Sequence, residues 1–276
     1  GATSGIGLAI CETFLQNNIR VFAIGRSIEK KVQLEQRFLQ ETKQGKLVIF
    51  LANMLEPEEI YHVSQEIQTL LDQDHHGHLD ALINNVGCVR SWYTTNSYGE
   101  EQQFALNHLA SFRLTHALLP SLLAAKGKVM MTSSKSHRHM NMHWRDLFFR
   151  HHYRPLMAYK QSKLANVLFA YELQQRYHSL GLQAYAIDPG LVNTAIGEKG
   201  TGGLVSWFWR QRRKHGVAPE VAAKTYLDLM SDTAHDGLYY YQSKAITYSK
   251  KVRASEAKKL FEISEGLCGF QFGGEQ

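Results

Sequence analysis

The sequence predicts one α/β domain built on a doubly wound parallel β-sheet with helices on both faces. Short apolar runs alternate with helical stretches along the whole chain, which is the pattern of parallel strands joined by crossover helices. The 276 residues are enough for one large core, and no internal repeat or low-complexity linker divides them. Polar or glycine-rich residues follow several apolar runs, as expected where strand ends border a ligand crevice. We therefore expect a single domain over residues 1–276.

Each predicted strand is a short apolar run bounded by polar, glycine or proline residues. The predicted strands are, in chain order, residues 20–25, 46–53, 79–85, 127–134, 182–188 and 238–242. The sequence starts at Gly1 inside a glycine-rich turn, with no strand before it. Because the first strand of a doubly wound sheet is central, these residues alone leave a gap in the sheet. We expect the natural chain to extend upstream with a short apolar strand ending in Thr.

The predicted helices fill the intervals between the strands. They cover residues 8–18, 28–44, 57–72, 100–125, 156–180, 219–230 and 254–265. Pro57 suits the first turn of its helix. In the stretch 156–180, Leu164, Leu168 and Tyr171 recur at helical spacing, and no Gly or Pro interrupts them.

The helix predicted over residues 156–180 carries a candidate acid–base pair. Tyr159 and Lys163 are four residues apart, so a helix places both on one face, one turn apart. A phenol has a pKa of about 10, and a nearby ammonium favours the phenolate and lowers that pKa. The pair therefore suits proton exchange with a hydroxyl or carbonyl at neutral pH. The same spacing also arises by chance, so the other motifs decide its meaning.

Gly1, Gly5 and Gly7 stand just before the first predicted helix. Backbone N–H groups in that place can approach a pyrophosphate, because no side chain blocks them and a helix N-terminus favours negative charge. A glycine cluster by itself is equally consistent with a plain turn.

Arg26 follows the strand predicted over residues 20–25 and indicates the cofactor type. An acidic residue in this place would hydrogen-bond a ribose 2′-OH, whereas an arginine accommodates a 2′-phosphate. No acidic residue follows the strand until Glu29. The sequence therefore favours NADP(H) over NAD(H), and the alternative is that Arg26 is an ordinary solvated residue.

Three further strand ends carry polar or glycine-rich residues. Asn85 lies in the segment 84–87, Ser134 ends the next strand, and Pro189 and Gly190 end the one after that. The asparagine amides could hold their loop together or line a cofactor ribose, and the serine hydroxyl could hold a substrate oxygen. A purely structural protein has no need for such chemistry at several strand ends along one edge of a sheet.

Together these motifs resemble the short-chain dehydrogenase/reductase family over nearly the whole chain. The family's Thr-Gly-x-x-x-Gly-x-Gly matches from Gly1 onward without its Thr, and its Asn-Asn-Ala-Gly appears as residues 84–87 with Val86 in place of Ala. Its Asn-Ser-Tyr-Lys tetrad matches Asn107, Ser134, Tyr159 and Lys163. Segments around these residues are most similar to the retinol-dehydrogenase-like group, which includes the WW-domain oxidoreductase and acts on retinoids, steroids and other lipophilic alcohols or carbonyls.

The resemblance implies a Rossmann-type NAD(P)-binding catalytic domain that interconverts a lipophilic alcohol and its aldehyde or ketone. It implies that Tyr159 is the general acid in reduction and the general base in oxidation, and that Lys163 lowers the pKa of Tyr159 and holds the nicotinamide ribose. Ser134 would position the substrate oxygen, and Asn107 would support the lysine through a relay water. The cofactor would carry the hydride while the protein orients it.

The resemblance also implies a set of cofactor-binding residues at the strand ends. They are Gly1, Ser4, Gly5, Ile6, Gly7, Arg26, Asn53, Met54, Asn85, Val86, Gly87, Tyr159, Lys163, Pro189, Gly190, Val192 and Thr194. Asn53 replaces the acidic residue that contacts adenine in the family, and it could still hydrogen-bond the ring without a charge.

Residues 191–216 are expected to close the substrate pocket as a lid. Trp207 and Trp209 stand beside the basic segment 210–214. This combination suggests a cover for a lipophilic substrate, or peripheral contact with a membrane through residues 204–214. The tryptophans could equally pack beneath the lid.

Composition excludes several other classes of protein. The net charge of +6 is spread along the chain without a nucleic-acid-binding motif, so no nucleic-acid partner is expected. Three widely separated cysteines argue against disulfides or a zinc site and favour a reducing, cytoplasmic location. The many histidines are interleaved with arginines, and we expect no metal site. No apolar run reaches the roughly 18 residues that span a bilayer; an upstream anchor, membrane association and homo-oligomer formation stay open.

The alternative from another class is a non-catalytic NADP(H)-binding sensor or scaffold. A complete tetrad argues against it, because a sensor has no need for Tyr159 and Lys163 together.

Overall fold

The computed structural model describes residues 1–192, 218–231 and 236–273. Every predicted strand is present, and a short strand that was not predicted follows them. The strands are β1 (Val21–Gly25), β2 (Leu47–Leu51), β3 (Ala81–Asn84), β4 (Lys128–Thr132), β5 (Gln183–Asp188), β6 (Tyr239–Tyr241) and β7 (Lys244–Ala245). The short β7 pairs antiparallel with β6 through a tight turn in which Gln242 and Ser243 have positive φ angles of 48° and 62°.

The predicted helices are also present, but two of them are divided. The helices are α1 (Gly5–Gln16), α2 (Ile28–Arg37), α3 (Leu39–Lys43), α4 (Pro57–Asp74), α5 (Gln102–Phe104), α6 (Ala110–Ala117), α7 (Leu119–Ala124), α8 (Pro155–Tyr177), α10 (Pro219–Met230) and α11 (Ala254–Cys268). A π-helical turn, η1 (Ala105–Leu109), joins α5 to α6, and 3-10 turns form η2 (Lys135–His139) and η3 (His178–Leu180).

The predictions of unbroken helices over residues 28–44 and 100–125 were therefore wrong in detail. The first is interrupted at Phe38, which leaves helical geometry with φ −115° and ψ 49°. The second is interrupted by η1 and again at Leu118. Pro120 explains the second break, because its ring has no N–H to donate and would clash with the carbonyl four residues earlier.

The described strands form two sheets rather than one. β1 pairs in parallel with β2, and the other sheet has the order β3-β4-β5-β6-β7, in which only the β6–β7 pair is antiparallel. The expected gap in the sheet is confirmed, because in the described residues β1 and β3 are not paired with each other and a cavity of about 590 Å³ lies between them. Its apolar lining includes Ile10, Phe14, Phe22, Ile67, Leu71 and Ile83.

The glycine turn crosses one end of this cavity. The N-terminal amine of Gly1 and the main-chain N–H of Ala2 donate to Ile24 O at 2.9 and 3.1 Å, and Asn85 Nδ2 donates to Gly1 O at 3.5 Å. Residues 1 and 2 therefore lie between the carboxyl ends of β1 and β3.

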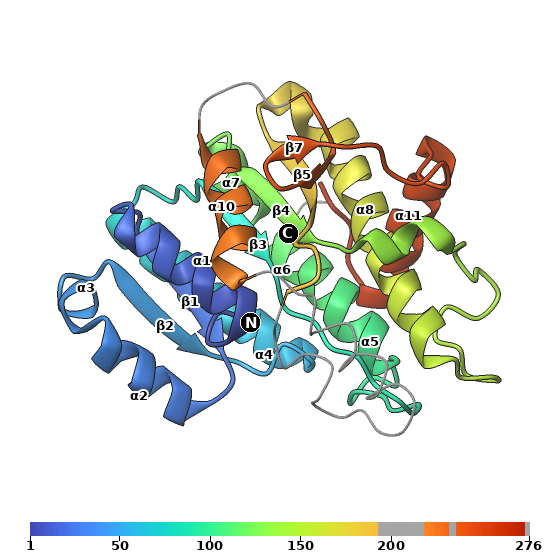
Figure 1. Ribbon diagram of the computed structural model, residues 1–276, viewed down its shortest axis with the longest axis horizontal. Helices are drawn as coiled ribbons and strands as arrows, with labels where there is room; N and C mark the ends of the chain where they lie inside the picture. Colours follow the sequence, from blue (N-terminus) through green and yellow to red (C-terminus); the bar gives the residue numbers. More distant parts are fainter. Residues whose placement is uncertain (193–217, 232–235, 274–276) are drawn as a thin grey trace.

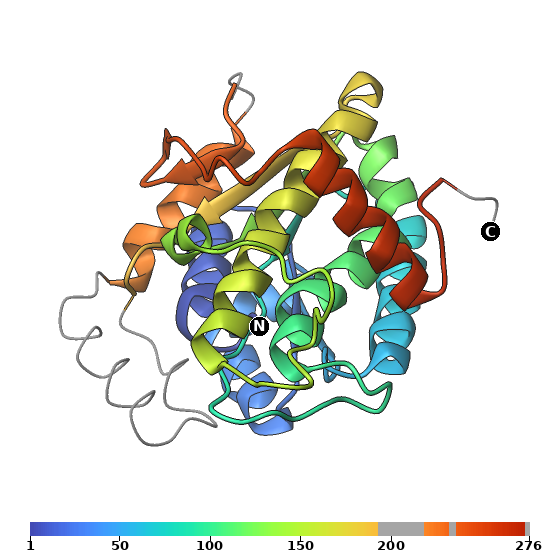
Figure 2. The ribbon, with the colours of Figure 1, turned by 90° about the vertical axis from the view of Figure 1, so that its right-hand side faces the viewer.

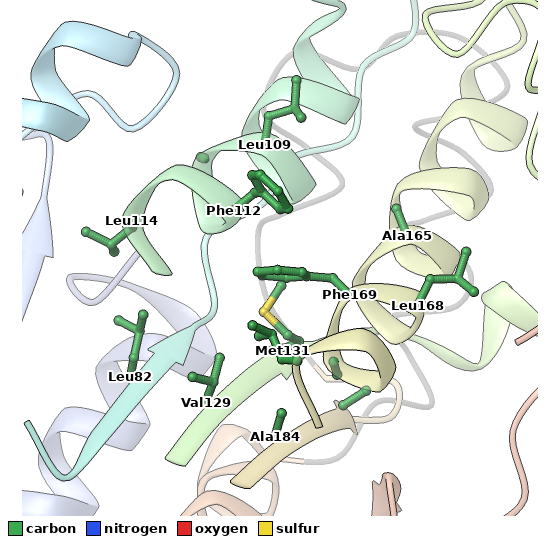
Figure 3. Close-up of a cluster of buried hydrophobic side chains, with 14 of the residues drawn as sticks. Leu82, Leu109, Phe112, Leu114, Val129, Met131, Ala165, Leu168, Phe169 and Ala184 are labelled. Carbon is green, nitrogen blue, oxygen red and sulfur yellow. The ribbon is translucent and has the colours of Figure 1, made fainter. Parts of the chain in front are cut away.

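Helices cover both faces of the five-stranded sheet, as Figure 1 and Figure 2 show. Successive residues of β4 point to opposite faces: Val129 and Met131 join the core with α4, α6 and α8, whereas Met130 joins α1 and α10. A strand that is apolar on both faces is typical of a parallel sheet. Figure 3 shows the first of these cores, where Phe112 of α6 meets Phe169 of α8 at a centroid distance of 4.9 Å.

Helix α11 lies beside α8 (Figure 2) and closes this core from outside. Its Phe261 contacts both Phe112 and Phe169 edge-on or tilted, at 5.2 and 5.8 Å. Among the described helices, none combines the length and apolar character needed to span a membrane.

Candidate active site

Helix α8 presents Tyr159 and Lys163 on one face, as their spacing predicts. Pro155 stands in its first turn, where a missing N–H is tolerated. Lys163 Nζ lies 5.8 Å from the centroid of the Tyr159 ring and donates to the main-chain O of Thr132, at the end of β4, at 3.1 Å. Both side chains are buried, and burial lowers the pKa of Lys163 to about 8, against the opposing effect of the Cys88 thiol.

The π-helical turn η1 brings Asn107 to the same place. Asn107 is fully buried, and the main-chain N–H of Cys88 donates to its Oδ1 at 2.7 Å. Gly87 lies between Asn107 and Lys163: a Cβ on Gly87 would stand 3.1 Å from Asn107 Oδ1 and 3.5 Å from Lys163 Nζ. The loop after β3, η1 and α8 therefore meet around a position that only glycine fits comfortably.

Ser134 follows β4 and begins the turn η2, which packs against α8. Its hydroxyl accepts from the main-chain N–H of Ser136 at 3.3 Å and is half-buried. The neighbouring Ser133 is buried and donates to the main-chain O of Lys163 at 2.8 Å. The two serines thus have different surroundings, with Ser133 attached to α8 and Ser134 at the strand end.

The glycine turn before α1 is packed too tightly for side chains. A Cβ on Gly7 would stand 2.1 Å from Gly1 O and 2.8 Å from Asn85 Nδ2, and Gly5 has a left-handed φ of +57°. Ser4 is the N-cap of α1, and the first turn of α1 contains no acidic residue. No carboxylate in the first turn of this described helix would therefore repel an anion at its N-terminus.

The other predicted cofactor-binding residues include four near the ends of β1 and β2 and at the start of α1. Arg26 follows β1 and is exposed, and Asn53 follows β2, where its main-chain N–H donates to Glu59 Oε2 at 2.6 Å. Met54 is buried in the core, so its side chain faces inward. Ile6 lies in the first turn of α1, is half-buried and packs against the core that α1 shares with α10.

Three of the predicted cofactor-binding residues follow the carboxyl ends of β3 and β5. Val86 lies against the glycine turn, since a Cβ on Gly1 would stand 3.0 Å from Val86 Cα. Pro189 and Gly190 follow β5, and the Gly190 N–H donates to Asp188 Oδ1 at 2.9 Å in a left-handed turn with φ +78°.

Val192 is the last described residue before the first gap. Thr194, nearly all of the lid predicted over residues 191–216, and the membrane-contact segment 204–214 lie outside the described residues.

The paired asparagines at the end of β3 separate in the structure. Asn84 points into the interior, where its Nδ2 donates to Thr115 Oγ1 at 3.1 Å, whereas Asn85 faces the glycine turn. Both amides make contacts that hold the structure together, since Asn85 Oδ1 also accepts from Thr132 Oγ1 at 3.4 Å. That Asn85 lines a cofactor ribose stays a prediction.

The sequence motifs missed several residues that hold the site. Thr132 O accepts from both Lys163 Nζ and Asn166 Nδ2, and a main-chain carbonyl leaves no trace in a motif. Ser162 and Asn166 could have been found, because they lie three and seven residues after Tyr159 and so share its helix face.

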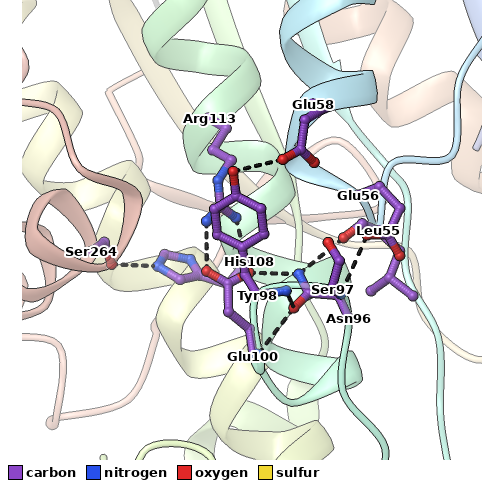
Figure 4. A network of polar contacts seen from close by, with 10 residues as sticks. All are labelled: Leu55, Glu56, Glu58, Asn96, Ser97, Tyr98, Glu100, His108, Arg113 and Ser264. Atoms are coloured by element: carbon purple, nitrogen blue, oxygen red, sulfur yellow. Dashed lines mark hydrogen bonds and ion pairs between the residues drawn. The ribbon is translucent and has the colours of Figure 1, made fainter.

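Figure 4 shows two sets of polar contacts near η1, one between His108 and α11 and the other between Arg113 of α6 and the segment 96–100. His108 Nε2 lies 3.0 Å from Ser264 Oγ of α11, and Arg113 pairs with the buried Glu100 at 2.5 Å. Burial lowers the pKa of His108 to about 3, so the ring is neutral at physiological pH. The described residues contain no cluster of His, Cys, Asp and Glu side chains that could hold a metal ion.

Comparisons with known proteins place this arrangement among dehydrogenases. Residues 1–202 match the family described as short chain dehydrogenase. Retinol dehydrogenase 14 of Mus musculus and retinol dehydrogenase 11 of Homo sapiens are each 30% identical, with 98% of this chain and 84% of the relative covered. Polyprenol dehydrogenase of Homo sapiens is 27% identical over 96% of this chain and 83% of its own length.

Solved structures share the fold. An uncharacterised protein from Mycobacterium paratuberculosis superposes with a TM-score of 0.76 at 25% identity, over 99% of this chain and 93% of that one. The NADPH-bound carbonyl reductase from chicken fatty liver superposes with a TM-score of 0.66 at 22% identity, over 90% and 96% of the two chains.

Proposed function

The chain belongs to the short chain dehydrogenase family, and on that premise we propose that it interconverts a lipophilic alcohol and its aldehyde or ketone with NADP(H). As a member of that family it is an oxidoreductase that acts on CH–OH groups with a nicotinamide cofactor. The relatives named retinol and polyprenol dehydrogenases support the lipophilic class of substrate. We further propose that residues 1–276 act as one catalytic domain with residues 191–216 as its lid.

The observation that carries the catalytic proposal is the meeting of Asn107, Lys163 and Tyr159 beside Gly87. Tyr159 gives its phenolic proton to the carbonyl oxygen in reduction and takes it back in oxidation. The ammonium of Lys163 favours the phenolate form of its neighbour, and Ser134 holds the substrate oxygen. The bound cofactor supplies or accepts the hydride.

The glycine turn supports the binding of a dinucleotide. The close approach of Gly1 O and Asn85 to Gly7 leaves no room for a side chain on Gly7 in the first turn of α1, and a helix N-terminus favours a pyrophosphate. Arg26 is exposed at the end of β1, adjacent to the end of β2 that carries Asn53. An exposed guanidinium in this place supports NADP(H), because it can pair with a 2′-phosphate.

A substrate panel tests the proposed function. Retinoids, steroids and medium-chain carbonyls are offered with NADPH, and the corresponding alcohols with NADP+, each beside the NAD(H) equivalent. We expect turnover of at least one lipophilic compound, with NADP(H) preferred. Turnover with NAD+ alone would contradict the cofactor, and no turnover of any lipophilic compound would contradict the substrate class.

The proposed membrane contact needs a separate test. Flotation with anionic liposomes is compared between the wild type and a variant with Trp207 and Trp209 changed to Ala. We expect the association to weaken in the variant, because aromatic side chains insert at the interface. Equal flotation of both proteins would rule the contact out.

A further inference from the structure

Ser162 lies between Tyr159 and Lys163 in the sequence and is fully buried. Its hydroxyl donates to the main-chain O of Tyr159 at 2.8 Å. The same oxygen accepts a hydrogen bond from Asn107 Nδ2 at 2.9 Å. A hydroxyl has one proton, and Ser162 donates that proton to Tyr159. Toward Asn107 it can therefore only accept, so the NH2 end of the Asn107 carboxamide must face the serine.

The rest of the Asn107 carboxamide is bonded to the loop after β3. The Cys88 N–H donates to its Oδ1 at 2.7 Å, and its Nδ2 donates to Cys88 O at 3.1 Å. Ser162 adds the bond to α8. The carboxamide therefore connects three segments that are far apart in the sequence, namely the Cys88 loop, η1 and the helix turn that carries Tyr159.

The position of Asn107 matters because the surroundings are closely packed. The space at Gly87 is bounded by Asn107 Oδ1 and Lys163 Nζ, at 3.1 and 3.5 Å from a Cβ placed there. A π-helical turn such as η1 is a rare geometry that occurs frequently at functional sites. Loss of the serine hydroxyl would leave a buried Asn107 N–H without its partner, and the carboxamide would move to find another.

We propose that Ser162 is a positioning residue of the dehydrogenase site, whose hydroxyl fixes Asn107 relative to Lys163 and Tyr159. This inference rests on the proposed function. Ser162 exchanges no proton with the substrate; it acts through Asn107.

The test compares Ser162→Ala with a matched control, Ser64→Ala. Ser64 is buried in α4 and donates to the carbonyl of Tyr61, three residues earlier, at 2.7 Å, which is the same local bond that Ser162 makes. Both variants lose one buried hydroxyl, and only Ser162 touches Asn107. We expect Ser162→Ala to lower kcat roughly ten- to a hundredfold and to shift the pH profile of kcat, with little change in NADPH affinity. Ser64→Ala should keep the wild-type kcat, and an equal kcat for the two variants would overturn the proposal.

A double-mutant cycle with Asn107→Ala identifies the route of the effect. If Ser162 acts through Asn107, its replacement should cost little further activity once the asparagine side chain is gone. The same loss of kcat in both backgrounds would show that Ser162 acts by another route and would refute the proposal.

Amide hydrogen exchange gives a readout that needs no substrate. The Cys88 N–H is protected by Asn107 Oδ1, so Ser162→Ala should speed its exchange roughly tenfold or more, while Ser64→Ala and the hydroxyl-retaining Ser162→Thr should not. Unchanged exchange in Ser162→Ala would contradict the positioning role even if kcat falls. A wild type without turnover on the substrate panel would instead sink the proposed function, and the exchange result would still decide whether Ser162 holds Asn107.

Discussion

Lys163 is a charged residue in the protein interior, only 3% exposed. A buried ammonium must be hydrogen-bonded, and the carbonyl of Thr132 at 3.1 Å provides one partner. Burial also lowers the pKa of Lys163 to about 8, so the charge beside Tyr159 persists at neutral pH and is lost only in alkaline solution. At the residue scale, the structure therefore places a buried positive charge beside Tyr159, as the proposed acid–base role of this tyrosine requires.

Replacing Tyr159 with Phe should abolish proton exchange and keep the packing, because the ring remains. We expect turnover to fall at least about a hundredfold, with NADPH binding unchanged by fluorescence titration. Tyr177→Phe is the matched control, since Tyr177 lies on the same helix and both tyrosines are 8% exposed. Wild-type turnover in Tyr159→Phe would mean that Tyr159 is not the acid–base group.

Arg26→Asp should reverse the cofactor preference. An acidic side chain repels a 2′-phosphate and can accept from a ribose 2′-OH, so the ratio of kcat/KM for NADPH over NADH should fall roughly ten- to a hundredfold. Lys43→Asp makes the same change in charge on the exposed face of α3, before β2 begins, and should leave the ratio unchanged. A ratio that stays constant in Arg26→Asp would remove Arg26 from the cofactor site.

At the scale of elements, the π-helical turn η1 is held by contacts from several neighbours. It places Asn107 toward Cys88 and Ser162, and the next residue, His108, toward Ser264 of α11. Two helices and a loop therefore hold one irregular turn. The helix α11 contributes to the site indirectly, through this attachment and the shared aromatic core.

His108 makes the folding stability of the protein depend on pH in acidic solution. Its pKa is lowered from 6.5 to about 3 by burial, so the unfolded chain binds a proton in mildly acidic solution that the folded protein does not. The stability that depends on neutral His108 is complete above pH 6.5 and is lost as the pH falls toward 3; at pH 5 the loss is about 2 kcal/mol.

Thermal unfolding at pH 7.5 and pH 5 tests this linkage. His108→Gln should lose less stability between the two pH values than the wild type does, because glutamine does not titrate. The exposed His62→Gln serves as control and should behave as the wild type. An identical acid-induced loss in His108→Gln and the wild type would exclude His108 as a cause of acid lability.

At the scale of the whole molecule, the cavity between β1 and β3 divides the sheet. Successive residues of a strand direct their main-chain carbonyls to opposite sides. The Gly25 carbonyl accepts from Ala52, on the side of β2, so the Ile24 carbonyl faces the cavity. There it accepts from Gly1 and Ala2. The cavity thus has strand edges on two sides and apolar helix side chains above and below. Its chemistry fits one parallel strand that is apolar on both faces.

A chain with five β-branched residues and a Thr joined before Gly1 should be more stable than the 276-residue chain. The added strand would pair with both edges and bury the cavity lining, and a gain of several kcal/mol corresponds to a rise in Tm of roughly 10 °C or more. An extension of equal length with a central proline should give little of this gain, because proline cannot complete the pairing. Equal Tm values for the two extensions would show that the cavity does not accept a strand.

The sequence by itself determined the order of strands and helices, the gap in the sheet and the shared face of Tyr159 and Lys163. The elements and the shared helix face follow from the periodicity of short stretches of chain. The gap follows from the central position of the first strand in a doubly wound sheet. Periodicity missed the breaks at Phe38 and Leu118 and the short β7. Pro120 was a sequence signal for the break at Leu118, whereas the break at Phe38 and the strand β7 each depend on a single turn that periodicity averages out.

Only the tertiary structure decided how the candidate site is held together. It sent Asn84 into the core and Asn85 to the glycine turn, although the two are neighbours in the same motif. It also placed Ser162 against Asn107 and the Thr132 carbonyl against Lys163. These contacts join residues 31 to 55 positions apart, and they exist because a polar group buried by packing must find a partner wherever the fold brings one.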